Sequence, residues 1–593
     1  MNKKWQTFKQ SLKQLAPFIS PYKWGFFLAI LMVVITNIAL AIAPSVEGLI
    51  TTQLMKDATD ILNKVPNAQV NFDAIIKIIV VLIAIYLIKT VSQVVLTFAL
   101  TNSIQNAMHD LRNVLQEKIR RLPVSYFDKH QYGDVLSRIT NDVDTVSNAL
   151  QQTLTQILSG ILTLILAIVM MVRINAMMAI IVCMIIPIAL FITRLVVRHS
   201  QKRFKAQQDA LGKLNGAITE MYTGYNEILL FNKQKQSVEK FKEINENLCQ
   251  NALKAQFLSS IISPCISLVT YIVIGTIGFI GSVLAINGTL QVGQLQAFVR
   301  YIWQVNDPIS QVSNLSSQIQ SAFAATTRVF EVLNEQEEDV STHPQVVKDI
   351  QGNVTFDHVH FGYNEKEIIH DLSVDIQSGQ MVAVVGPTGS GKTTLISLLL
   401  RFYDVTSGSI KIDGIDIRDM SREDLRSLFG MVLQDTWLFN GTIYDNIRYG
   451  RMDARKDEII DAAKQANVHH FIRTQPDGYN MQINEEGNNI SQGEKQLLTI
   501  ARAILKNPQI MILDEATSSV DTRLEKMLQE AMQNVMKNRT SFVIAHRLST
   551  IKSADLILVI RDGCIVEKGT HEELILNDGF YKQLYNAQFA EQE

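Results

Sequence analysis

The chain has 593 residues, 47% of them hydrophobic and 19% charged, and its mean hydropathy is slightly positive at +0.11. A soluble protein usually has about 25% charged residues, so this composition argues against a wholly soluble enzyme and indicates a chain divided between membrane and water. The net charge of −2 offers no basic field for nucleic acid, and the four scattered cysteines argue against a disulfide scaffold or a zinc site.

Six apolar stretches are long enough to cross a membrane as helices. A hydrocarbon core of about 30 Å requires about 20 mostly apolar residues. The stretches cover approximately residues 24–42, 74–96, 157–172, 177–196, 257–286 and 292–308. Arg300 and Asp307 interrupt the last stretch, which also fits an amphipathic soluble helix. We include it because an even number of spans returns the chain to its starting side.

The charges of the connecting segments predict the orientation of the spans. Lysine and arginine gather in the leading 23 residues and in the connections after spans two and four, whereas the opposite side has only Lys56, Lys64 and Arg173. Because positively charged loops stay in the cytoplasm, both termini are expected there. The leading segment is basic and amphipathic, unlike a cleaved secretory signal. The composition, rich in Lys, Asn, Gln and Ile, fits a multi-pass protein of a bacterial plasma membrane.

The two long cytoplasmic connections repeat apolar residues at helical spacing, for example Leu111, Leu115 and Ile119. This periodicity predicts helices that extend the spans into the cytoplasm. Turn-forming residues predict bends at residues 126–133 and 222–225. Each bend is expected either to dock on a surface at the inner face of the membrane or to be an ordinary tertiary turn.

Two basic residues within the spans, Lys89 and Arg300, are candidates for a substrate cavity. A charge inside a bilayer is costly and usually faces a water-filled path or a partner. The alternative is a side chain that reaches the interface or forms an ion pair. Gly275, Gly278 and Gly281 in the fifth span are expected to allow close helix packing.

The composition changes after about residue 340, where polar turns separate short β-branched runs from helical segments. This alternation predicts an α/β domain. We therefore expect an all-α transmembrane domain over residues 1–325, a linker over 326–350 and an α/β domain over 351–593.

A nucleotide-binding motif follows the apolar run 381–385, which is typical of a buried strand. The motif has the form G-x-x-x-x-G-K-T and precedes an apolar helix, the context that a phosphate-binding loop requires. Its backbone N–H groups are expected to surround phosphate oxygens, with Lys392 on the β- and γ-phosphates and the Thr393 hydroxyl on Mg²⁺. The predicted nucleotide-binding residues of this loop are Gly386, Pro387, Thr388, Gly389, Ser390, Gly391, Lys392, Thr393 and Thr394.

Two further strands end in residues that suit ATP hydrolysis. The run 510–513 leads into Asp514 and Glu515, and the run 541–545 leads into His546. Asp514 is predicted to hold Mg²⁺ through water, Glu515 to polarise the attacking water and His546 to sense the γ-phosphate. Three polar strand ends beside one phosphate loop predict an ATPase site.

At this point the chain resembles an ABC exporter half-transporter, with six spans followed by one nucleotide-binding domain. Tyr363 matches the aromatic that stacks on adenine, and Gln434 matches the glutamine of the Mg²⁺ site, which also has a catalytic role. Residues 485–487 fall where exporters have an acidic contact loop, Asp521 lies in the D-loop, and residues 127–144 are similar to the first intracellular loop. The resemblance implies ATP and Mg²⁺ as cofactors, and membrane lipids and a small-molecule substrate as partners.

One motif departs from the family pattern. The family's L-S-G-G-Q signature is replaced here by Ile490 followed by Ser491, Gln492, Gly493 and Glu494. In the family, this motif of one domain contacts the ATP bound to the other. Gln492 replaces a glycine where close backbone approach matters, and Glu494 brings negative charge near a polyanion.

The combination of complete catalytic residues and a weakened signature resembles one subunit of the heterodimeric multidrug exporters. It implies a partner half-transporter with an intact signature, one hydrolytic site and one degenerate site. A homodimer that tolerates the substitutions is the alternative. The resemblance implies drug export by alternating access, with lipid export, peptide export and a regulatory membrane ATPase with little transport as alternatives.

Overall fold

The computed structural model describes residues 13–338, 350–363, 366–433, 436–484, 489–514, 522–545 and 548–589. These residues form two compact units. The first falls within Met1–Arg121 and His130–Glu335, and the second within Leu122–Lys129 and Gln336–Glu593. The second unit therefore includes a short segment, 122–129, that lies in the sequence between transmembrane helices.

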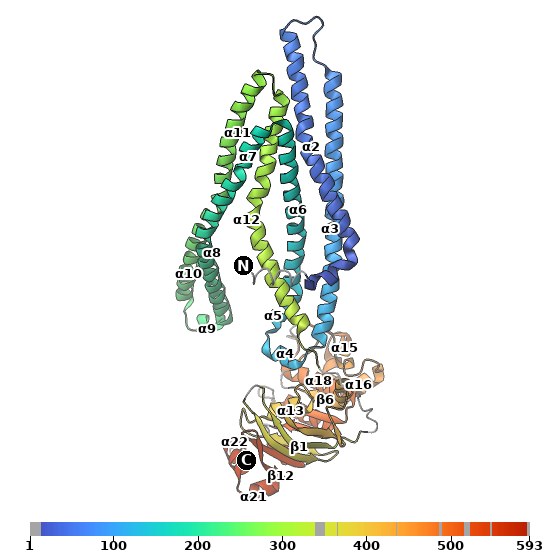
Figure 1. Cartoon of the computed structure of the whole chain (residues 1–593). Coiled ribbons are helices and arrows are strands. Elements are labelled where there is room, and N and C mark those ends of the chain that lie inside the picture. The colour runs from blue at the N-terminus through green and yellow to red at the C-terminus, as the bar shows by residue number, and fades with distance from the viewer. Residues whose placement is uncertain are drawn as a thin grey trace. The chain divides into compact units, whose positions relative to one another are not determined.

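The first unit is built of helices (Figure 1). A 3₁₀ turn at Ser20–Tyr22 precedes them, and a π-helical segment, Arg138–Asp142, interrupts the third long helix. The α-helices are α2 (Lys23–Leu62), α3 (Phe72–Arg120), α5 (Tyr132–Ser137), α6 (Val143–Ile174), α7 (Ala176–Cys183), α8 (Ile185–Thr223), α9 (Tyr225–Leu230), α10 (Gln234–Ser260), α11 (Ile262–Ile286) and α12 (Val292–Asn334).

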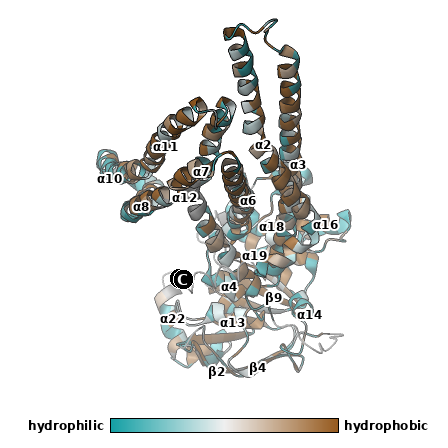
Figure 2. Ribbon diagram, turned by 45° about the horizontal axis from the view of Figure 1, so that its top comes forward, coloured by the Kyte–Doolittle hydropathy of each residue, from teal (hydrophilic) through white to brown (hydrophobic). Residues whose placement is uncertain are grey.

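Five helical stretches among the described residues are long and apolar enough to cross a membrane. They are Lys13–Leu62, Phe72–Arg120, Tyr132–Ile174, Ala176–Thr223 and Gln234–Ile286. Each contains one of the first five predicted spans and continues well beyond it, as the helical periodicity of the connections predicts. Figure 2 shows hydrophobic residues along α2, α3, α6 and α11 and more hydrophilic ones on α10.

The predicted sixth span, 292–308, lies in α12, which does not meet the same length and composition criteria within the described residues. Phe298, Tyr301 and Ile302 of α12 are nevertheless fully buried, in a cluster that includes residues of α6, α7 and α11. The sixth span therefore remains a prediction. The helix is continuous to Asn334, so the beginning of the predicted linker is helical.

Glycines allow a close contact in the first unit between α2 and α12. A Cβ atom on Gly48 would lie 2.2 Å from the carbonyl oxygen of Gly293, and one on Gly293 would lie 1.7 Å from that of Gly48. Of the glycines predicted to pack in the fifth span, only Gly281 meets a neighbour closely; Gly275 and Gly278 have no atom of another element within 4 Å of a Cβ position. That part of the packing prediction is wrong, because those two glycines face open space.

The second unit contains three sheets. An antiparallel sheet has the order β2 (Ile369–Ile376), β1 (Val354–Phe361), β4 (Ser407–Ile412) and β5 (Ile415–Asp416). A larger sheet has the order β12 (Cys564–Gly569), β11 (Leu556–Arg561), β3 (Met381–Val385), β10 (Thr540–Ile544), β9 (Ile510–Asp514) and β6 (Phe429–Val432). It is parallel except for β12 at its edge. A third, small sheet pairs β7 (Gly441–Thr442) with β8 (Gln482–Ile483).

Helices cover the sheets of this unit, and a 3₁₀ turn occupies Gly478–Asn480. Strand β3 is buried on both faces: Val382 and Val384 belong to one hydrophobic cluster, and Ala383 and Val385 to another. This explains its uninterrupted apolar sequence. The helices are α4 (Val124–Lys129), α13 (Lys392–Leu399), α14 (Arg422–Ser427), α15 (Ile443–Arg448), α16 (Lys456–Gln465), α17 (His469–Thr474), α18 (Gln492–Lys506), α19 (Thr522–Met536), α20 (Leu548–Lys552), α21 (His571–Leu576) and α22 (Phe580–Phe589).

Asp413, in the turn between β4 and β5, fastens the segment that leads into β1. Its carboxylate accepts hydrogen bonds from the backbone N–H groups of Gln351, Gly352 and Asn353 at 2.8–3.0 Å, and from the Asn353 amide at 2.7 Å. Burial alone would raise the pKa of Asp413, but these hydrogen bonds outweigh it and hold the pKa below its ordinary value. The charged form therefore stabilises the fold.

We expect Asp413→Asn to lower the free energy of unfolding at neutral pH by about 1–3 kcal/mol, because an amide cannot accept all four hydrogen bonds. Since the native pKa is depressed, the contribution of the carboxylate is present above the ordinary value of ~3.9 and is lost as pH falls below it. The melting temperatures of wild type and variant should therefore converge towards low pH. Asp419→Asn, at an exposed carboxylate, is the control; a pH-independent difference would contradict the assignment.

Candidate functional site

The phosphate-binding loop connects β3 to α13, as the motif predicts. Gly389 and Gly391 have φ angles of +81° and +107°, a backbone region that favours glycine. A Cβ atom on Gly391 would lie 2.8 Å from the side chain of Ile369, so the loop packs tightly on β2. The hydroxyl of Ser390 is buried, with no hydrogen-bond partner in the described part of the chain. This unused polar atom and the glycine conformations suit a loop that surrounds an anion.

Lys392 begins α13 and lies against the loop. Its ammonium group donates hydrogen bonds to the carbonyl oxygens of Gly386, at 2.7 Å, and Pro387, at 3.0 Å. Burial lowers the pKa of Lys392, and the carboxylate of Asp514 opposes this effect. The two residues predicted to hold phosphate and Mg²⁺ are thus electrostatic neighbours.

The register of the parallel strands explains this proximity. Ile544 of β10 pairs with Val384 of β3 on one side and with Asp514 of β9 on the other. The carboxyl ends of the three strands therefore lie at one edge of the sheet, where the phosphate loop begins. Glu515 directly follows the last residue of β9, and His546 comes two residues after Ile544, the last residue of β10. Both lie outside the described residues.

Three other predictions from the nucleotide-binding domain also fall outside the described residues. They are Gln434, Asp521 and the acidic loop 485–487. Thr393, the predicted Mg²⁺ ligand of the loop, is exposed on α13 beside Lys392, and Thr394 is buried.

Tyr363, the predicted adenine contact, follows β1. Its hydroxyl donates a 3.3 Å hydrogen bond to Thr394, and its ring is 38% exposed. The ring packs edge-on against Phe361, at 5.0 Å between centroids, and against Tyr403, at 4.8 Å. A partly exposed tyrosine therefore lies beside the helix that follows the phosphate loop.

The residues of the altered signature form the start of α18. Ser491 is the N-cap: its hydroxyl accepts from the N–H of Glu494 and donates to the Glu494 carboxylate at 2.6 Å. That carboxylate also accepts from the N–H of Ser491 at 3.0 Å. Gln492 is exposed and donates to Thr436 at 3.4 Å, whereas Gly493 is buried. Glu494 thus occupies polar groups at a helix N-terminus that would otherwise suit an anion.

The two basic residues predicted within the spans have different partners. Arg300 on α12 forms a 3.5 Å ion pair with Glu47 on α2, which also accepts a 2.5 Å hydrogen bond from Tyr86 on α3. Lys89 lies 5.9 Å from the centre of the Tyr86 ring. The sequence analysis missed Glu47 because it ended the first span at residue 42, although α2 continues to Leu62. The Arg300 side chain is 64% exposed despite its ion pair.

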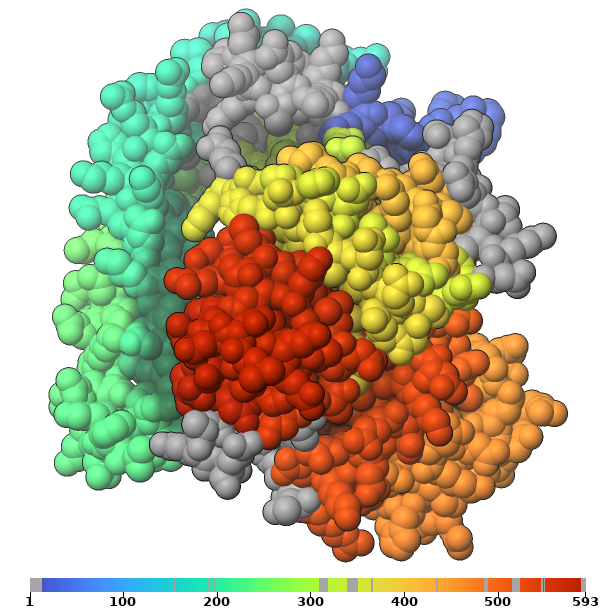
Figure 3. Space-filling view, turned by 90° about the horizontal axis from the view of Figure 1, so that it is seen from below, coloured from blue at the N-terminus to red at the C-terminus, as the bar shows by residue number. Residues whose placement is uncertain are grey.

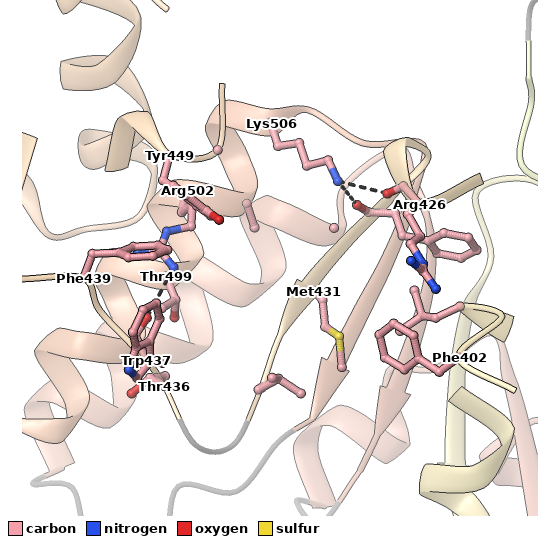
Figure 4. Close-up of a pocket in the computed structure, with 16 residues that line it drawn as sticks. Phe402, Arg426, Met431, Thr436, Trp437, Phe439, Tyr449, Thr499, Arg502 and Lys506 are labelled. Carbon is pink, nitrogen blue, oxygen red and sulfur yellow. Dashed lines mark hydrogen bonds between the residues drawn. The ribbon is translucent and has the colours of Figure 1, made fainter. Parts of the chain in front are cut away.

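A cavity of about 540 Å³ in the second unit has aromatic and basic walls (Figure 4). Trp437 and Phe439 pack edge-on at 4.2 Å, and the guanidinium of Arg502 lies over the rings of Phe439 and Tyr449 at 5.7 and 5.3 Å. Arg502 also donates to the backbone and side chain of Asn446 at 2.9 and 3.0 Å. Burial lowers the pKa of Arg502. The sequence signal for this cavity is the group of aromatic residues after Gln434. The sequence analysis did not use that signal.

The first predicted bend, 126–133, belongs to the second unit up to Lys129 and to the first unit from His130. Helix α4 contains Asp128, whose carboxylate accepts a hydrogen bond from the hydroxyl of Tyr403. Burial, followed by this hydrogen bond, raises the pKa of Tyr403. The bend is thus joined to the aromatic group that contains Tyr363. The second bend, around α9, exposes Tyr222, Tyr225, Leu229, Leu230 and Phe231.

Comparison with known proteins extends the similarity to the whole chain. Residues 26–309 match the ABC transporter transmembrane region, and residues 369–518 match the ABC transporter family. The chain is 44% identical to the fatty acid ABC transporter ATP-binding/permease protein of Mycobacterium bovis, over 89% of this chain and 83% of that protein. It is 35% identical to the ATP-dependent lipid A-core flippase of Syntrophus aciditrophicus, over 86% and 85% of the two chains.

A solved structure has the same fold over almost the whole length. It is a bacterial Atm1-family ABC exporter with ATP bound, 28% identical, with a TM-score of 0.76 over 96% of this chain and 98% of that chain. The phosphate loop, the aligned strand ends and the helical membrane unit are therefore parts of one known architecture. The chain belongs to the ABC transporter family, as a multi-span exporter half-transporter whose transmembrane domain is followed by a nucleotide-binding domain that binds ATP and couples its hydrolysis to transport.

Proposed function

We propose that this half-transporter exports amphipathic or hydrophobic small molecules across a bacterial plasma membrane as one subunit of a heterodimer. Both termini are in the cytoplasm in this proposal. The observation that carries it is the contrast between an intact phosphate loop with Asp514 and Glu515 and a signature whose Glu494 binds its own helix N-terminus. Half-transporters of this family function as dimers, so each ATP needs residues from two chains.

The hydrolytic site uses this chain's catalytic residues. Lys392 and the loop N–H groups hold the phosphates, Tyr363 stacks on adenine, and Glu515 accepts a proton from the attacking water. His546 contacts the γ-phosphate, and Asp521 reaches across to the other domain. Hydroxyl and carboxylate oxygens at one sheet edge are hard ligands that fit Mg²⁺, so Thr393 and Asp514, with Gln434, would hold that ion. Bound there, the ion neutralises phosphate charge.

The degenerate site is the one that this chain's signature completes. A γ-phosphate there would compete with the Glu494 carboxylate for the Ser491 hydroxyl and would meet like charge. The side chain of Gln492 adds bulk where a glycine allows close approach. In a homodimer both ATP sites would contain the altered signature. In a heterodimer, a partner with an intact signature would complete one of the two ATP sites.

Transport follows from closure of the paired nucleotide domains. ATP shifts the equilibrium because it binds the closed state, in which two chains contact it, better than the open state. Helix α4, held to Tyr403, transmits this movement to the membrane helices. The aromatic cavity of this chain, lined by Trp437, Phe439 and Tyr449, receives the corresponding bend of the partner subunit in this proposal, and this chain's own exposed bend docks on the partner.

The charged group on α2, α3 and α12 is the candidate substrate contact. Arg300 remains largely exposed although it pairs with Glu47, so it retains hydrogen-bonding capacity for a polar head group. A lipid-like amphiphile is a second candidate substrate, since relatives are named as a fatty acid transporter and a lipid A-core flippase. The first candidate substrate is a drug, as in multidrug export.

Glu515→Gln is expected to lower the ATPase rate of the complex by about 10²- to 10⁴-fold, the usual contribution of a general base, while ATP binding is retained. The variant should accumulate in the closed state, which nucleotide occlusion measures together with turnover. Glu572→Gln, at an exposed carboxylate on α21, is the control. Rapid turnover of the Glu515 variant together with its partner would refute its assignment as the base.

Extraction of the complex from its native membrane tests the heterodimer. We expect native mass spectrometry to detect a stoichiometric second chain of similar mass, because a homodimer of this chain would have two weakened signatures. A single species of twice 66.7 kDa would contradict the asymmetric pair of sites. Sequencing the second chain would also reveal whether its signature is intact.

Arg300→Ala is expected to raise the concentration of an anionic amphiphile needed for half-maximal ATPase stimulation by about 10-fold, the loss of one charge-assisted contact. A long-chain carboxylate in liposomes is the probe, with uptake into inside-out vesicles measured in parallel. Arg173→Ala, at the end of α6, is the control. An unchanged response of the Arg300 variant would exclude this group as the substrate contact, and stimulation without uptake would favour a regulatory ATPase.

A further inference from the structure

A carboxylate joins two histidines at the base of the hairpin that contains Tyr363. Glu367 accepts a hydrogen bond from His360 of β1 at 2.6 Å, and its other carboxylate oxygen lies 3.2 Å from Nδ1 of His370 of β2. The hydrogen bond from His360 contributes most to lowering the pKa of Glu367, which keeps it a carboxylate at neutral pH. Both strands of the hairpin are thus joined through one side chain.

The hairpin is narrow at this point. The N–H of Ile368 donates a 2.7 Å hydrogen bond to the carbonyl of Phe361. Gly362 lies so close to the returning strand that a Cβ atom would be 2.4 Å from the carbonyl oxygen of Lys366 and 3.0 Å from the Cα of Glu367. Tyr363 therefore directly follows a glycine that packs against the backbone of Lys366 and Glu367.

The same hairpin is connected to the phosphate loop. The N–H of His370 donates to the carbonyl of Gly563 at 3.0 Å, and the N–H of Gly563 donates to the carbonyl of Ser390 at 3.2 Å. Gly563 has φ +79°, and a Cβ atom there would lie 2.0 Å from the carbonyl oxygen of Ile368. Figure 3 shows residues from the C-terminal region, in red, beside the yellow region of the domain. The backbone therefore links Ser390 to the histidine that contacts Glu367.

We propose that Glu367, held by His360 and His370, is a positioning residue that sets Tyr363 against the adenine of bound ATP. This inference rests on the proposed stacking role of Tyr363. Glu367 does not contact the nucleotide. It limits the conformations of the hairpin, so less conformational entropy is lost when the base binds. Its effect should appear in recognition of the base and not of the phosphates, which the loop at 386–393 holds.

Glu367→Ala tests this role in the full-length complex. Aromatic stacking on a base contributes about 1–3 kcal/mol, so we expect Tyr363→Ala to raise the KM for ATP roughly 10-fold and Glu367→Ala to raise it roughly 3- to 10-fold, with kcat changed less than 2-fold. The inhibition constant of inorganic tripolyphosphate, which has no base, should stay unchanged. Glu367→Gln, which keeps one acceptor oxygen, should give an intermediate KM.

A double-mutant cycle separates positioning from general stability. Adding Glu367→Ala to Tyr363→Ala should raise the KM no further, because the residue acts only through the ring. Asp371→Gly is the matched control: it removes the carboxylate that makes a similar 2.6 Å contact, to His358, between the same two strands, at a φ of +47° that glycine tolerates, and should leave the KM unchanged.

Three results would overturn the inference: an unchanged KM in Glu367→Ala, an additive effect in the double variant, or an equal loss of affinity for tripolyphosphate. Failure of the stacking role is distinguishable from these, because Tyr363→Ala alone would then leave the KM for ATP unaltered. If the Ala variant does not fold, the Gln variant and its own cycle with Tyr363→Ala provide the same comparison.

Discussion

The alignment of three buried parallel strands is the constraint on which the nucleotide site depends. Strands β3, β10 and β9 are apolar over the residues that lead to their carboxyl ends, at 381–385, 542–544 and 510–513, and their register brings those ends to one edge. Polar chemistry can therefore begin only where the strands stop. Lys392 and Asp514 become neighbours for this reason, although more than a hundred residues separate them in the sequence. The register of the buried strands therefore determines both the packing of the hydrophobic core and the position of the nucleotide site.

Much of this arrangement could be predicted from sequence because its signals are local. The phosphate loop has a fixed spacing between a strand and a helix, and the structure has that loop between β3 and α13. The long helices follow from apolar periodicity. Partners distant in the chain had no such signal: Glu47, which pairs with Arg300, lies beyond the predicted first span, and the Gly48–Gly293 contact joins two helices separated by most of the membrane unit. Helix packing determines those pairs, and spacing alone does not specify it.

The contact between α4 and Tyr403 also illustrates this difference. The turn residues at 126–133 predict a bend, but its partner, a tyrosine that follows the phosphate-loop helix, has no motif of its own in the sequence analysis. In the structure the same tyrosine packs on Tyr363. One aromatic side chain therefore touches both the ring proposed to bind adenine and the helix proposed to move the membrane domain. A shift of either would disturb the other, since packed aromatic rings do not deform independently.

The capping box at the start of α18 gives the altered signature a physical interpretation that residue identity alone does not provide. A glutamate three residues after a capping serine is a common way to begin a helix, and it stabilises this one by satisfying otherwise unpaired groups. The carboxylate also engages the N–H and the hydroxyl of Ser491. In the proposed heterodimer these contacts would compete with a phosphate from the other subunit, so one side chain would both stabilise the helix and weaken the site. In the proposed heterodimer this cost would fall on only one of the two ATP sites, so a partner with a glycine-rich signature would allow this chain to keep its capped helix without losing a hydrolytic site.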